Sequence, residues 1–67
     1  MEKRFISSSH ISVVSHDGKD MFIDFKNGSR YRYNNVGYHT FDALTKSESP
    51  GKFFHMAVRD KFICTKL

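Results

Sequence analysis

Residues 25–36 read FKNGSRYRYNNV, and this stretch decides the predicted fold. Asn27-Gly28 is a turn signal, and after it Tyr31 and Tyr33 alternate with two arginines. Because successive side chains of a strand point to opposite faces, the alternation predicts a strand with aromatic rings on one face and guanidinium groups on the other. The preceding residues 21–25, MFIDF, predict the other strand of a hairpin.

The length of the loop in this hairpin determines which side chains face each other. A two-residue loop would place Phe25 opposite Arg30, which pairs a core residue with a charge. A three-residue loop over residues 26–28, with the glycine in the left-handed conformation, places Ile23 opposite Tyr31 instead. We therefore predict the three-residue loop, because it brings apolar and aromatic side chains together.

Residues 11–15, ISVVS, precede the turn pair Asp17-Gly18 and predict a further strand. A three-residue loop over residues 16–18 would place Val13 opposite Met21. Odd-numbered strand positions would then face the core: Ile11, Val13, Met21, Ile23, Phe25, Tyr31 and Tyr33. The outer face would carry Ser12, Val14, Phe22, Asp24, Lys26, Arg30, Arg32 and Asn34.

Two helices are predicted after the strands. Apolar residues recur at helical spacing over residues 38–46, and Ser49-Pro50 is a typical start for a second helix, which we expect to end near Asp60. The sequence thus predicts an α+β fold of order β-β-β-α-α, a three-stranded antiparallel meander with two short helices packed on one face. We expect residues 1–9 to be a flexible lead-in, residues 10–63 a single domain and residues 64–67 a tail.

Size and charge favour a binding protein over an enzyme. A domain of 67 residues has a small core, filled here by seven Phe and three Tyr, which leaves little room for a deep catalytic cleft. The formal net charge of +4 favours anionic partners, and nucleic acid is the first candidate. With a lone cysteine, Cys64, no signal-peptide pattern and no long apolar run, we expect a cytoplasmic protein without membrane association.

No pattern indicates catalysis, metal or cofactor binding. The four histidines show no metal-ligand spacing with one another or with Cys64, and the acidic residues are dispersed along the chain. The chain also lacks a glycine-rich nucleotide-binding motif. We therefore expect no catalytic residue, no metal and no cofactor.

Two segments resemble the KTSC domain, a small module found at the C-terminus of some lysyl-tRNA synthetases and alone in bacteria and phages. They are NGSRYRYNNV at residues 27–36 and SESPGKFFHMAVRDKF at residues 47–62, within a resemblance that covers about residues 11–62. The chain departs from the family pattern at Gly37, where the family usually has proline, and at His55, where it usually has asparagine. RNA binding has been suggested for this family, so the resemblance implies RNA, including tRNA, as a partner.

Two surfaces are candidate RNA-binding sites. One is the outer sheet face, where basic side chains would contact the phosphates and an aromatic ring would stack on a base. Its residues are Phe22, Lys26, Arg30 and Arg32. The other is the start of the second helix, where free amides, the helix dipole and a basic stripe attract phosphate: Gly51, Lys52, His55 and Arg59. Each is alternatively an ordinary solvated face, and we expect Tyr31 and Tyr33 to pack in the core rather than stack on bases.

We predict a small basic module that binds RNA through phosphate contacts and limited stacking, with an affinity that falls as salt rises. The alternative is a protein-interaction module, such as a phage-encoded inhibitor or a small subunit of a larger assembly, which accepts a partner strand at an exposed sheet edge. A small-nucleotide binder would need a pocket, and the sequence does not reveal one.

Overall fold

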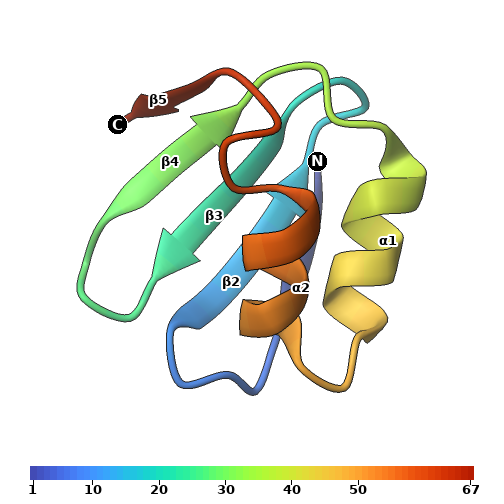
Figure 1. Ribbon diagram of the computed structural model, residues 1–67. Helices are drawn as coiled ribbons and strands as arrows, with labels where there is room; N and C mark the ends of the chain where they lie inside the picture. Colours follow the sequence, from blue (N-terminus) through green and yellow to red (C-terminus); the bar gives the residue numbers. More distant parts are fainter.

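A five-stranded antiparallel sheet with two helices on one face forms the protein (Figure 1). The computed structural model describes residues 1–67. The sheet has the strand order β1-β2-β3-β4-β5. In chain order the elements are β1 (Glu2–Phe5), β2 (Ile11–His16), β3 (Met21–Phe25), β4 (Arg30–Tyr33), α1 (Tyr38–Lys46), α2 (Pro50–Ala57) and β5 (Cys64–Lys66). The predicted α+β class and the position of α1 are confirmed.

The predicted count of three strands is wrong, because a short strand is added at each edge of the meander. β1 lies in the segment that we expected to be a lead-in, and it pairs with β2 with Arg4 opposite Val14. β5 lies in the segment that we expected to be a tail, and it pairs with β4 with Thr65 opposite Arg32. Both strands are short and mostly exposed, so they lack the apolar alternation by which a strand is recognised.

The β3–β4 hairpin has the predicted register. The Phe25 amide donates to the Ser29 carbonyl at 2.8 Å across a three-residue loop, in which Gly28 has a φ of 94°. Ile23 lies opposite Tyr31. Only glycine adopts this left-handed conformation at little cost, so the Asn27-Gly28 pair sets the register of the hairpin.

The predicted register of the β2–β3 hairpin is wrong. Val14, and not Val13, faces the helices opposite Ile23, and it is fully buried. His16 lies opposite Met21 on the same inner face. Val14 was expected on the outer face, so the alternation of odd and even positions holds in β3 and β4 but not through β2.

The turn after β2 causes this shift, and a β-bulge then reverses it at Ile11. The carboxylate of Asp17 accepts the amides of Lys19 and Asp20 at 2.9 and 2.7 Å, which closes a tighter turn than the predicted loop over residues 16–18. A β-bulge between Ile11 and Val13 then adds one residue to the strand. The bulge returns Ile11 to the inner face, where it is fully buried.

The helices cover most of the inner face of the sheet and complete the core. α2 begins at Pro50 after the N-cap position Ser49, as predicted, but it ends at Ala57 and not near Asp60. Asp60 has a left-handed φ of 63°, where the chain turns toward β5 (Figure 1). Neither helix has the length and apolar character needed to span a membrane. The buried apolar core is Ile11, Val14, Met21, Ile23, Tyr33, Val36, Phe41, Leu44, Phe54 and Val58.

His16 is a core histidine with a defined tautomer. Its Nδ1 accepts the Gly18 amide at 3.1 Å, so the proton lies on Nε2, which is 2.6 Å from the Val36 carbonyl oxygen and donates to it. The ring packs 5.4 Å from that of Phe41, and the residue is only 3% exposed. Both ring nitrogens are thus used to attach the β2–β3 turn to the start of α1.

Arg4 attaches β1 to α1. Its Nη1 donates to Asp42 Oδ1 at 2.7 Å and to Thr45 Oγ1 at 2.8 Å, and its guanidinium carbon lies 4.8 Å from the centre of the Phe41 ring. Its Nε donates to Glu2 at 2.8 Å. The hydrogen bond from Arg4 lowers the pKa of Asp42, and hydrogen bonds from Tyr38 and then Arg4 lower the pKa of Glu2.

This network makes stability depend on pH in a defined direction. Because both carboxyl pKa values are lowered on folding, their contribution is complete above the ordinary values of 4.5 and 3.8 and is lost as the pH falls through the lowered ones. We expect Arg4→Gln to reduce the drop in melting temperature between about pH 7 and about pH 3. Lys3→Gln, which removes the same charge from the exposed face of β1, is the control and should retain the full drop. Equal drops in the two variants would contradict the role of Arg4.

The observed register of β2 predicts unequal effects for one substitution at two neighbouring valines. Val14→Thr places a hydroxyl in the core and should lower the free energy of unfolding by about 1–3 kcal/mol. Val13→Thr at the half-buried outer position should change it by less than about 0.5 kcal/mol. Urea denaturation measures both values, and the opposite order of effects would restore the predicted register, in which Val13 faces the helices.

Candidate functional site

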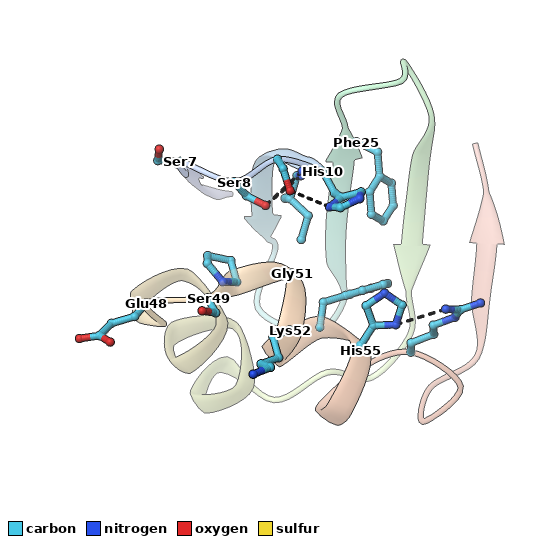
Figure 2. Close-up of a pocket in the computed structure, with 14 residues that line it drawn as sticks. Ser7, Ser8, His10, Phe25, Glu48, Ser49, Gly51, Lys52 and His55 are labelled. Carbon is cyan, nitrogen blue, oxygen red and sulfur yellow. Dashed lines mark hydrogen bonds between the residues drawn. The ribbon is translucent and has the colours of Figure 1, made fainter.

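A groove of about 610 Å³ lies between the loop that follows β1 and the first turns of α2 (Figure 2). We call it the α2 groove. On one side lie the residues between β1 and β2, on the other side lies α2, and Phe25 of β3 closes one end. Its polar and charged lining consists of Ser7, Ser8, Ser9, His10, Glu48, Ser49, Lys52, His55 and Arg59.

The start of α2 presents free backbone donors to this groove. Pro50 has no amide hydrogen, and the Phe53 amide donates to the Ser49 carbonyl at 2.9 Å. The amides of Gly51 and Lys52 donate to no backbone carbonyl, and the Ser49 hydroxyl makes no capping hydrogen bond. The first turn contains no acidic residue. These free amides and the positive end of the helix dipole together favour an anion at this place.

The loop opposite α2 is held by its own hydrogen bonds. Ser8 Oγ accepts the amides of His10 and Ile11 at 3.2 and 3.3 Å, and Ser9 Oγ lies 2.9 Å from His10 Nδ1. A Cβ atom added at Gly51 would lie 3.9 Å from Ser8 Oγ and 4.0 Å from His10 Nδ1. The serine loop thus approaches the first turn of α2 to within ordinary van der Waals contact of such a Cβ atom.

The basic stripe formed by Lys52 and His55 of α2 and by Arg59 just after α2 lines the same groove. Lys52, His55 and Arg59 are all exposed, and neither Lys52 nor Arg59 forms an ion pair with a carboxylate. His55 Nδ1 accepts a hydrogen bond from Arg59 Nη1 at 3.2 Å. One of the two predicted groups of site residues thus lies on a single concave surface: Gly51, Lys52, His55 and Arg59.

The other group lies on the far side of the sheet. Phe22, Arg30 and Arg32 point away from the helices, and Lys26 is exposed in the turn after β3. Arg30 Nε lies 3.2 Å from Asp24 Oδ1, and the Arg30 guanidinium carbon lies 5.7 Å from the centre of the Phe22 ring. Arg32 Nε is buried without a partner. Arg30 is therefore neutralised and covers the ring on which a base was expected to stack.

A second cavity, of about 350 Å³, lies beside the α2 groove, under the open part of the inner sheet face. We call it the aromatic pocket. Four rings line it: Phe25, Tyr31, Tyr33 and Phe54. Tyr33 belongs to the core as predicted, and its burial raises the pKa of its phenol to about 12, whereas Tyr31 is only half-buried. Phe25, Phe54 and Arg59 border both cavities, so the two are adjacent.

Sequence reasoning missed part of this site. It assigned no site residue to residues 1–9, although Ser7, Ser8 and Ser9 form one wall of the groove. A run of three serines followed by a histidine was the available signal. Nothing in the local pattern indicates that this run lies against α2, because that contact joins segments about forty residues apart in the sequence.

Comparisons with known proteins agree with this fold. The family model of the KTSC domain matches residues 7–62. The crystal structure of a KTSC domain protein from Yersinia pestis is similar to this chain with a TM-score of 0.92 and 26% sequence identity, and the match covers 98% of this chain and 96% of that chain. No curated protein shows significant similarity to this chain. The resemblance inferred from the sequence is confirmed, and the chain belongs to the KTSC domain family.

Proposed function

We propose that this KTSC domain is a binding module that holds RNA in the α2 groove. One observation carries the proposal: free helix amides and cations without acidic partners converge on a single concave surface. The amides belong to Gly51 and Lys52, and the cations to Lys52 and Arg59. Groups of both kinds bind phosphate oxygens in nucleic-acid complexes.

The groove suits a chain of phosphates better than a single phosphate. Lys52 lies in the first turn of α2 and Arg59 follows its last turn, so the two cations lie near opposite ends of an eight-residue helix, which is about 12 Å long at a rise of 1.5 Å per residue. A charge at a helix N-terminus is stabilised by only about 0.3–1 kcal/mol at an exposed site. Useful affinity thus requires several phosphates at once, which a polynucleotide supplies. The net charge of +4 favours the approach of such a polyanion.

The α2 groove is a better candidate than the outer sheet face. On the outer face, Asp24 already pairs with Arg30, and Arg30 lies over Phe22, so RNA would have to displace an existing contact. Neither cavity of the molecule reaches Phe22, Arg30 or Arg32. In the groove, no carboxylate pairs with Lys52 or Arg59, and the hydrogen bond from Arg59 to His55 leaves the charge of Arg59 uncompensated.

Two double variants of equal charge distinguish these surfaces. Lys52→Glu with Arg59→Glu should weaken binding to tRNA or to an unstructured oligoribonucleotide by tenfold or more at low salt, because phosphate contacts become repulsions. Arg30→Glu with Arg32→Glu removes the same charge from the outer face and should have a much smaller effect. Filter binding measures both, with circular dichroism as the test of folding. A larger loss in the outer-face variant would move the site there, and absence of binding by the unchanged protein would reject the proposal.

Salt dependence should report the number of phosphates in the groove. For single strands the slope of log K against log salt is about −0.7 per neutralised phosphate, so two or three contacts give a slope of about −1.4 to −2.1. Removing one contact with Lys52→Gln should make the slope shallower by about 0.7. Lys61→Gln, at an exposed position outside both cavities, is the matched control and should leave the slope unchanged. A slope of zero would show that binding does not depend on phosphate contacts.

A further inference from the structure

We propose that the aromatic pocket receives one unpaired base of the RNA strand whose phosphates lie in the α2 groove. This inference rests on the proposed function, and it specifies the ligand as single-stranded RNA rather than a duplex. The bases of an RNA duplex are paired and stacked, whereas an unpaired base turns outward and stacks on aromatic side chains.

The pocket exists because the helices do not cover the whole inner face of the sheet. α2 ends at Ala57 and the chain turns at Asp60, so no helix lies over the end of β4 that carries Tyr31 (Figure 1). On β5, the partners of Tyr31 and Tyr33 are Lys66 and Cys64, which belong to an exposed strand. Tyr31 and Phe25 are half-buried and therefore stay partly accessible at the edge of the core, beside the buried rings of Tyr33 and Phe54.

Contacts among the four rings hold the pocket in shape before any ligand binds. Phe25 meets Tyr31 edge to face, with centroids 5.8 Å apart and planes at 84°. Phe54 meets both Phe25 and Tyr33 in the same manner, at 5.6 and 5.8 Å. The volume of about 350 Å³ lies near the lower end of the range of about 300–1,000 Å³ for ligand pockets, which suits one ring system.

Polar groups at the rim are available to the edge of a base. Asn27 Oδ1 accepts the Ser29 amide at 2.9 Å, which leaves the amide nitrogen of Asn27 free. Neither tyrosine hydroxyl makes a hydrogen bond within the chain, so each can donate one to a ligand. Asp60 also lines the pocket and adds an acceptor. A flat group with donors and acceptors on its edge, such as a nucleobase, matches both the rings and the rim.

Arg59 joins the two parts of the site. It borders the α2 groove and the aromatic pocket, and its Nη1 hydrogen-bonds to His55. A phosphate at Arg59 therefore lies at the entrance of the pocket, and the base attached to the adjoining sugar is the group placed to enter it. Phe25 and Phe54 form the continuous wall between the phosphate sites and the base site.

The test compares a short oligoribonucleotide with an abasic strand of the same length, which keeps the sugar and phosphate backbone. Stacking of one base on an aromatic ring is worth about 1–3 kcal/mol, so the base-bearing strand should bind about 5- to 150-fold more tightly in fluorescence anisotropy at low salt. Tyr31→Leu, which keeps an apolar side chain but removes the ring, should reduce that ratio toward one. Tyr31→Phe, which keeps the ring, should retain it.

The outcomes separate this inference from the proposed function. If the unchanged protein binds both strands equally and Tyr31→Leu has no effect, the base site is wrong while the phosphate groove stands. If a blunt RNA duplex binds as tightly as the single strand, the base site is also wrong. If neither strand binds at low salt, the proposed function fails and the inference fails with it. The comparison of the two strands on the unchanged protein remains decisive even if Tyr31→Leu does not fold.

Discussion

The left-handed glycine in the β3–β4 turn is the constraint on which the rest of the structure depends. With Gly28 in this conformation the loop has three residues, and Tyr31 and Tyr33 face the helices. A slip of one residue would exchange the two faces of β4 and bury Arg30 and Arg32. The two-sided character of the sheet, aromatic toward the helices and basic away from them, follows from this one turn.

The same packing that forms the core also builds the candidate site. Phe25 and Phe54 contact each other at the margin of the core and, at the same time, line both cavities. The core is small because the chain is short, so its outermost aromatic residues are only partly covered. In this fold, the same residues form the edge of the hydrophobic core and one wall of the candidate binding surface.

Intramolecular contacts of the acidic residues decide which cations are free. Five of the seven carboxylates have partners within the chain: Glu2 and Asp42 bind Arg4, Asp24 binds Arg30, Asp17 accepts turn amides, and Asp20 accepts the Asn35 amide. None of these five lies in the α2 groove. Glu48 is the acid that lines it, and it forms no ion pair with Lys52. The positive charge of the groove is therefore available to an external anion.

The α+β class, the β3–β4 register, both helix starts and the two groups of basic residues could be predicted from the amino-acid sequence, because turn chemistry and short-range periodicity encode these features. The register of β2, the edge strands and the composition of the site could not, because they depend on how distant segments pack. The bulge beside Ile11 is favoured by core packing against the helices, and β1 is attached through Arg4 to residues of α1. The serine loop meets α2 across about forty residues of chain, and the two basic groups lie on opposite faces of one sheet. Such contacts depend on the packing of distant segments, which local residue patterns do not encode.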